Sequence, residues 1–143
     1  MIKVSIAMIT YNHERFLKEA LDSILCQKTN FPFEVVIGED CSMDNTRKIV
    51  QEYEEKYPDI IKPLYHKKNK GMIGNVYEVL MNCTGEYIAF LEGDDYWTDI
   101  NKLQKQVDFL DVNKDYFMVA HECSMVDIEG KEIEKNYKTN FIR

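Results

Sequence analysis

The stretch Lys3-Val-Ser-Ile-Ala-Met-Ile-Thr10 decides the fold class. It is short, apolar and rich in β-branched residues, and it ends at the polar turn Tyr11-Asn12-His13. A continuous apolar run of this length is typical of a strand buried on both faces of a parallel sheet. Parallel strands need long crossover connections, which are usually helices. The sequence therefore predicts a strand followed by a helix at the N-terminus.

The same alternation continues along the chain. Apolar residues recur at helical spacing within residues 16–25, 49–57, 74–81 and 103–110. The expected strands cover residues 3–10, 33–38, 60–65, 87–91 and 116–120, and two short strands flank a Glu129-Gly130 turn within residues 125–133. Alternating strands and helices predict an α/β sandwich with a mostly parallel central sheet.

The length of 143 residues predicts one domain, and 45% apolar with 30% charged residues is an ordinary globular balance. The net charge is −7, from 18 Lys and Arg against 25 Asp and Glu, which argues against nucleic acid as a partner. No apolar run approaches the ~20 residues of a transmembrane helix, and the N-terminus lacks the apolar stretch of a signal peptide. We therefore predict a cytoplasmic protein without a transmembrane segment.

Polar residues follow each of the first four expected strands. They are Thr10, Tyr11 and Asn12 after the first, Glu39 and Asp40 after the second, Lys67 to Gly71 after the third, and Glu92 to Asp95 after the fourth. In open α/β sheets, ligands bind beyond the carboxyl ends of the strands. The four clusters are thus predicted to share one ligand-binding edge of the sheet.

The most informative cluster is Glu92-Gly93-Asp94-Asp95. Its three carboxylates repel one another unless a cation or hydroxyl groups lie between them, and divalent ions such as Mg²⁺ prefer such oxygen ligands. An acidic turn that caps the next helix is the alternative. The position of this turn after a buried strand favours a ligand site.

The other clusters have two interpretations as well. Asp40 could accept a hydrogen bond from a ligand ring, whereas Ser42 and Asp44 could cap the following helix. The lysines of residues 67–70 could neutralise a diphosphate or simply be solvated. His13, His66 and His121 match no nucleophile or metalloprotease pattern and are expected to be structural or on the surface.

Taken together, several motifs resemble one known family in their order and spacing. They are Val4 to Asn12, Ser23-Ile-Leu-x-Gln27, Glu39-Asp-x-Ser-x-Asp44, Asn69-x-Gly71 with Asn75, Thr84 to Ala89, and Leu91-Glu-Gly-Asp-Asp-Tyr-Trp97. This pattern resembles the N-terminal half of family 2 glycosyltransferases. The resemblance implies a Rossmann-like GT-A three-layer sandwich. Residues 1–143 would form a single nucleotide-sugar-binding domain that is apparently truncated at the C-terminus, with the acceptor half largely absent.

The resemblance also implies an activity: transfer of a sugar from a nucleoside-diphosphate sugar, with a UDP-sugar as the expected donor, to an acceptor hydroxyl with inversion. The implied nucleotide-sugar site comprises Thr10, Tyr11, Asn12, Glu39, Asp40, Asp44, Asn69, Lys70, Gly71, Asn75 and Asp94. Asp95 together with Asp94 would hold Mn²⁺ or Mg²⁺. Glu92 departs from the pattern, because an aspartate is frequent there.

The general base of the transfer is expected beyond Arg143, and the late carboxylates Glu122 and Asp127 are not assigned that role. Family analogy implies a saccharide or lipid-linked acceptor in polysaccharide or glycolipid biosynthesis, with peripheral association at the inner face of the membrane. An exposed apolar face or sheet edge would favour a homo-oligomer. The alternatives are a non-catalytic nucleotide-sugar-binding module and a nucleotidyltransferase.

Overall fold

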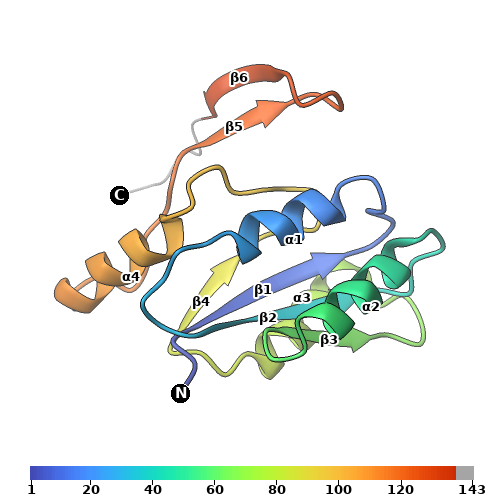
Figure 1. The fold of residues 1–143 in the computed structure, drawn as a ribbon, viewed down its shortest axis with the longest axis horizontal. Coiled ribbons are helices and arrows are strands. Elements are labelled where there is room, and N and C mark those ends of the chain that lie inside the picture. The colour runs from blue at the N-terminus through green and yellow to red at the C-terminus, as the bar shows by residue number, and fades with distance from the viewer. Residues whose placement is uncertain (138–143) are drawn as a thin grey trace. The chain divides into compact units, whose positions relative to one another are not determined.

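The computed structural model describes residues 1–137 (Figure 1). The chain divides into two compact units, Met1–Val107 and Asp108–Arg143, which are described separately. Within residues 1–137, no helix combines the length and the apolar character needed to cross a bilayer.

The first unit contains a four-stranded sheet that positions the candidate site. Its strands are β1 (Val4–Thr10), β2 (Phe33–Glu39), β3 (Ile61–Tyr65) and β4 (Tyr87–Phe90). All neighbouring strands are parallel, in the order β3-β2-β1-β4, which confirms the predicted parallel sheet. The chain moves outward from β1 to β3 and then returns to the other side of β1 at β4. The topological switch point, where such sheets bind ligands, therefore lies between β1 and β4.

Helices cover both faces of this sheet, as expected for three layers. Helices α1 (Leu17–Leu25) and α2 (Thr46–Lys56) lie on one face, and α3 (Gly71–Asn82) lies on the other (Figure 1). Helix α4 (Lys102–Val112) contributes its first turns to the α1 side. These elements agree with the predicted ones to within a few residues. The largest differences among the helices are at the starts of α2 and α3, which begin at Thr46 rather than residue 49 and at Gly71 rather than residue 74.

The main hydrophobic core lies between the sheet and the α1 layer. Along β1, Ile6 and Met8 point into this core, whereas Ala7 points to α3. Each large aliphatic side chain buried in this way contributes about 1.5–3 kcal/mol. Trp97 is buried in the same core. The apolar first strand is thus buried on both faces, as its sequence predicts.

Strand β4 pairs only with β1 in the described sheet, so it is an edge strand. Ile88 and Phe90 on this strand are exposed apolar side chains, 44% and 59% accessible. The opposite edge, β3, contains Pro63, a residue that interrupts strand pairing. The apolar edge of the sheet is therefore at β4.

A buried polar cluster joins the amino ends of β1 and β2 to the loop before β4. The Glu34 carboxylate accepts hydrogen bonds from Ser5 Oγ at 2.6 Å, from Thr84 N at 2.9 Å and from Thr84 Oγ1 at 2.8 Å. Burial opposes ionisation of Glu34, but these hydrogen bonds outweigh it and hold the pKa of the carboxyl below its usual range. The charged form is therefore favoured in the folded state.

We expect Glu34→Gln to lower the free energy of unfolding at neutral pH by about 1–1.5 kcal/mol, since charge-assisted hydrogen bonds become neutral ones. The folded-state pKa of Glu34 is depressed, so its contribution is present above the unfolded-state pKa and is lost as the pH falls through the folded-state pKa. Urea unfolding should show the difference between variant and wild type shrinking as the pH falls below about 4.3 and vanishing only below the folded-state pKa of Glu34. Glu55→Gln, at an exposed position of α2, is the control; a difference that persists in acid would contradict the assignment.

The described part of the second unit contains a hairpin of β5 (Cys123–Val126) and β6 (Glu132–Tyr137). The turn between them includes Gly130 at φ 78°, and the Asp127 carboxylate accepts hydrogen bonds from two backbone N–H groups of the turn. This hairpin confirms the two strands predicted around Glu129-Gly130.

The strand predicted at residues 116–120 was wrong, because these residues form no strand. Tyr116 N instead donates to Asn113 O in a turn, and the Tyr116 ring packs edge-on against Phe109 at 5.4 Å between centroids. The apolar run that suggested a strand is used in part for this local aromatic contact. The single-domain organisation expected from the length stays a prediction.

Candidate nucleotide-sugar site

A cavity of about 300 Å³ lies at the carboxyl edge of the sheet. It is lined by residues of the clusters that follow β1, β2, β3 and β4, so the sequence correctly predicted that these clusters meet. The expected site residues that line it are Thr10, Tyr11, Asp40, Asn69, Gly71 and Asn75. The remaining lining residues are Ile9, His13, Met72 and Glu92.

Asp40 connects the end of β2 to the start of α3. It is 2% exposed, and its carboxylate accepts hydrogen bonds from Lys70 N at 2.7 Å and Gly71 N at 2.9 Å. Gly71 adopts a left-handed φ of 72°, and its N–H is shared with Asn69 Oδ1. Asp40 thus caps the N-terminus of α3 although it lies 31 positions before Gly71 in the sequence. Local helical spacing could therefore not predict that α3 starts at Gly71. Lys70 itself does not line the cavity, and its Nζ pairs with Glu78.

Asn12, an expected nucleotide ligand, does not line the cavity. It adopts a left-handed φ of 57°, its side-chain oxygen accepts a hydrogen bond from Met43 N at 2.8 Å, and its N–H donates to Ser42 Oγ at 3.0 Å. Asn12 therefore joins the turn after β1 to the turn after β2.

Asp44 belongs to the same connection and also lies outside the cavity lining. Its carboxylate accepts hydrogen bonds from Thr46 N at 2.9 Å and from Glu14 N at 3.1 Å. Burial opposes ionisation, but these hydrogen bonds outweigh it and hold the pKa of Asp44 below its usual range. The contacts of Asn12 and Asp44 are thus structural, and direct contact of either residue with a nucleotide stays a prediction.

Glu39 is completely buried beneath the site, although it was expected to bind the ligand. Its carboxylate accepts hydrogen bonds from Ser42 N at 2.7 Å and from the Arg47 guanidinium, and Arg47 also donates to His66 O at 2.7 Å. Glu39 does not line the cavity. Arg47 was not predicted, because nothing in its local sequence indicates a partner at the end of β2.

The network continues to the cavity through His66 and Asn75. Asn75 Nδ2 donates to Gly38 O at 2.8 Å, so its Oδ1 faces His66 Nε2 at 3.0 Å as an acceptor. His66 therefore carries a proton on Nε2. Asn75 is 2% exposed and fixes α3 against β2, which places the first turn of α3 at the cavity.

The acidic turn after β4 packs closely against the end of β1. Gly93 N donates to Ile9 O at 3.0 Å, and Gly93 is buried. A Cβ at this position would lie 2.7 Å from Thr10 Oγ1 and 2.9 Å from His13 Nδ1. Only glycine therefore allows the turn to approach β1 this closely.

The carboxylates of this turn disfavour one another's ionisation. Partial burial and the neighbouring Asp94 charge raise the pKa of Asp95, and burial with the charges of Asp94 and Asp95 raises the pKa of Glu92; His13 opposes both shifts. Hard carboxylate oxygens with excess negative charge fit a divalent cation. Residues 1–137 contain no ready-made cluster of three or more ligating side chains. Such a cation would therefore complete its coordination with ligand and water oxygens.

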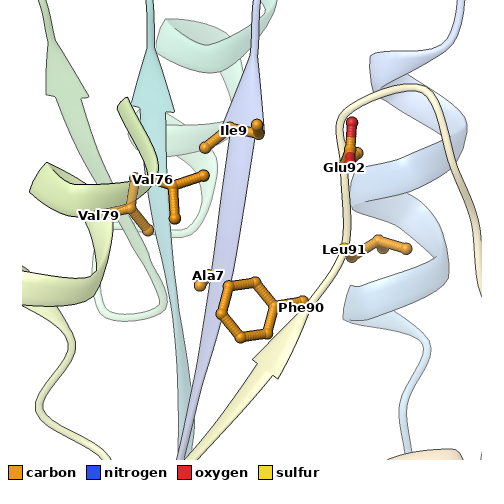
Figure 2. A pocket seen from close by; sticks show the side chains of 7 residues that line it. All are labelled: Ala7, Ile9, Val76, Val79, Phe90, Leu91 and Glu92. Atoms are coloured by element: carbon orange, nitrogen blue, oxygen red, sulfur yellow. The ribbon is translucent and has the colours of Figure 1, made fainter. Parts of the chain in front are cut away.

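A second, apolar cavity of about 80 Å³ lies next to the first, between α3 and β4. Figure 2 shows Val76 and Val79 of α3 facing Phe90 of β4, with Ala7 of β1 between them. Ile9 and Glu92 line both cavities.

Comparison with known proteins assigns the family. The model of glycosyl transferase family 2 matches residues 5–141. The chain belongs to glycosyl transferase family 2. The resemblance inferred from the motifs is thereby confirmed.

Similar proteins and solved structures agree with the fold. An uncharacterised protein of Mycobacterium tuberculosis is 42% identical over 127 residues, which cover 89% of this chain and 37% of the relative. The crystal structure of TarS 1–349 from Staphylococcus aureus with UDP is similar at a TM-score of 0.68 and 34% identity, over 78% of this chain and 32% of that chain. The mannosyltransferase PcManGT of Pyrobaculum calidifontis, solved with GDP-Man and Mn²⁺, is similar at a TM-score of 0.68 and 27% identity. This match covers 76% of this chain and 32% of that chain. The GT-A fold is confirmed, and the chain spans well under half the length of these relatives.

His13 is the residue at the cavity that sequence reasoning missed. It was expected to be structural or on the surface, yet it lines the cavity and its Nδ1 lies 3.7 Å from Asp94 Oδ1. Its position directly after the Thr10-Tyr11-Asn12 cluster was the available signal.

Proposed function

We propose that this chain is the donor-binding part of a glycosyltransferase that transfers a sugar from a nucleoside-diphosphate sugar to an acceptor hydroxyl. The observation that carries the proposal is the cavity at the carboxyl edge of the sheet, with the acidic turn at its side. TarS and PcManGT, solved with UDP, UDP-GlcNAc or GDP-Man, support a nucleotide-sugar ligand.

Asp95 and Asp94 are the residues that would hold Mn²⁺ or Mg²⁺. A bound divalent cation supplies positive charge where the diphosphate leaving group develops negative charge. The raised pKa of Asp95 fits this role, because ionising this carboxyl carries a cost that a cation would offset. The Mn²⁺ in the PcManGT complex supports the same choice of ion.

Asp40 is the residue proposed to recognise the base. Its two oxygens each accept one backbone hydrogen bond, which leaves lone pairs for a ligand N–H. Uracil and guanine offer a ring N–H of this kind, whereas cytosine and adenine do not. The UDP and UDP-GlcNAc in the TarS complexes support uracil, so a UDP-sugar is the proposed donor. Thr10 and Tyr11 line the cavity on the β1 side, and Asn69 and Gly71 line it on the α3 side.

The transfer is proposed to invert the anomeric carbon, which requires a general base within reach of the acceptor hydroxyl. Asp127 is occupied by its own turn, where its carboxylate accepts hydrogen bonds from Glu129 N and Lys131 N. The base is therefore proposed to lie outside the described residues. The name of TarS, a poly(ribitol-phosphate) β-N-acetylglucosaminyltransferase, supports a polymeric acceptor, and a saccharide or lipid-linked acceptor in polysaccharide biosynthesis stays a prediction. Oligomeric state, cytoplasmic location and membrane association stay predictions.

Calorimetric titration with UDP, GDP and ADP, with and without Mn²⁺, tests the proposal. We expect UDP to bind most tightly and Mn²⁺ to strengthen its binding at least tenfold, about 1.4 kcal/mol. Binding of none of the three nucleotides, or binding indifferent to Mn²⁺, would overturn the proposal. Hydrolysis of UDP-GlcNAc by the same preparation would exclude the non-catalytic binding module.

A further inference from the structure

We propose that His13 is a positioning residue for the acidic turn: its imidazole Nδ1–H is a hydrogen-bond donor that fixes the Asp94 carboxylate, and with it the turn that carries Asp95. The role of the turn in holding a cation rests on the proposed function. The contact between His13 and the turn rests on the structure of the chain alone.

The backbone of His13 is held on both sides. Its N–H donates to Thr46 Oγ1 at 2.8 Å, and its carbonyl accepts hydrogen bonds from Phe16 N and Leu17 N at the start of α1. The preceding residue, Asn12, is bonded to the turn after β2. The imidazole therefore starts from a fixed Cα and reaches toward the turn after β4.

The ring nitrogen on the turn side lacks a partner. His13 Nδ1 is buried and makes no hydrogen bond, and the same holds for Thr10 Oγ1, whose residue is 2% exposed. Both atoms lie against Gly93. A buried polar atom without a partner costs about 1–3 kcal/mol, and native proteins contain few of them. Two such atoms at one contact indicate that a hydrogen-bond partner reaches them in another conformation of the turn.

Asp94 is the partner that the distances favour. Its Oδ1 lies 3.7 Å from His13 Nδ1, which is about 1 Å longer than a charge-assisted hydrogen bond. The Asp94 side chain is 46% exposed, so it has room to turn toward the ring. Because Nδ1 is buried against the turn, His13 acts through Asp94 and does not touch the ligand with this atom.

Two substitutions distinguish the effect of the Nδ1–H donor from the effect of the volume of the ring. His13→Leu fills the space without a donor, whereas His13→Asn places an amide N–H at the position of Nδ1. If His13→Leu does not fold, His13→Gln takes its place. The amide of glutamine lies one bond further from the backbone than that of asparagine, so it does not place an N–H at the position of Nδ1. His121→Leu, at an exposed histidine of the second unit, is the matched control.

The first measurement is amide hydrogen exchange without ligand, read at Gly93 and Asp95, whose N–H groups bond to Ile9 O and Glu92 O. We expect exchange about tenfold faster in His13→Leu and within about threefold of wild type in His13→Asn, relative to the amides of β2. Unchanged exchange in His13→Leu, or equal acceleration in both variants, would overturn the positioning role.

The second measurement is the affinity for UDP with Mn²⁺, which we expect to fall about tenfold in His13→Leu, to be restored by His13→Asn and to be unchanged in His121→Leu. If wild type binds no nucleoside diphosphate, the proposed function fails, while the exchange measurement still decides the role of His13. Wild-type affinity in His13→Leu would show that Asp94 does not depend on this residue.

Discussion

We expect Asp95→Asn to weaken Mn²⁺-dependent UDP binding by more than about 100-fold, because the variant loses a charged oxygen ligand of the cation. The ligand-free variant should nevertheless be slightly more stable than wild type. Partial burial and the Asp94 charge raise the pKa of Asp95, so its ionised form is disfavoured in the folded state. The neutral amide removes this cost.

The raised pKa of Asp95 determines how the stability gain of Asp95→Asn depends on pH. A carboxyl with a raised folded-state pKa contributes stability below its unfolded-state pKa and loses that contribution as the pH rises through the folded-state pKa. The gain in melting temperature, about 1–2 °C for a screened charge, should therefore appear at neutral pH and disappear below about pH 4. Calorimetry and thermal unfolding measure the two effects, with Asp59→Asn at an exposed turn as the control. Retained UDP affinity would contradict the ligand role of Asp95.

The largest loss of stability is expected for Gly38→Ala. A Cβ on Gly38 would overlap Asn75 Oδ1 and would lie 2.6 Å from Val79 Cγ2, in the buried contact between β2 and α3. The variant must therefore displace α3 and strain or break the hydrogen bonds of Asn75 to Gly38 O and to His66. Overpacking and lost buried hydrogen bonds together cost about 3–5 kcal/mol.

Urea unfolding measures this loss, which is a large part of a typical stability of about 5–15 kcal/mol. Gly74→Ala is the matched control in the same helix, with Lys70 Cβ as its nearest neighbour at 3.0 Å, and its effect should stay within about 1 kcal/mol. Nucleotide binding should fall together with stability in Gly38→Ala, because α3 forms one wall of the cavity. A Gly38→Ala protein as stable as wild type would show that α3 adjusts without cost.

Much of the fold could be predicted from the sequence because its strands are short, apolar and separated by helices of clear periodicity. The rule that ligands bind at the carboxyl ends of such strands also predicted that Thr10, Asp40 and Gly71 meet, and all three line one cavity. The prediction was wrong at residues 116–120, where an apolar run forms no strand.

The roles of individual polar residues could not be predicted in the same way. Glu39 and Arg47 are eight positions apart and join β2 to α2 inside the protein, and His66 meets Asn75 across the start of α3. Such partners are chosen by tertiary packing, which leaves no periodic signal in the sequence. His13 was missed for a related reason, since its neighbour Gly93 is distant in the chain.

The connection between the turns after β1 and β2 bears on the diagnosis of activity in other members of the family. Asn12 and Asp44 bind backbone groups of their own chain, so the fold retains a use for them even where sugar transfer has been lost. Inactive members, or pseudoenzymes, should therefore keep these two residues while the Asp94-Asp95 pair is free to change. If the acidic pair holds the cation as proposed, that pair, rather than the two connecting residues, is expected to separate an enzyme from a scaffold of the same shape.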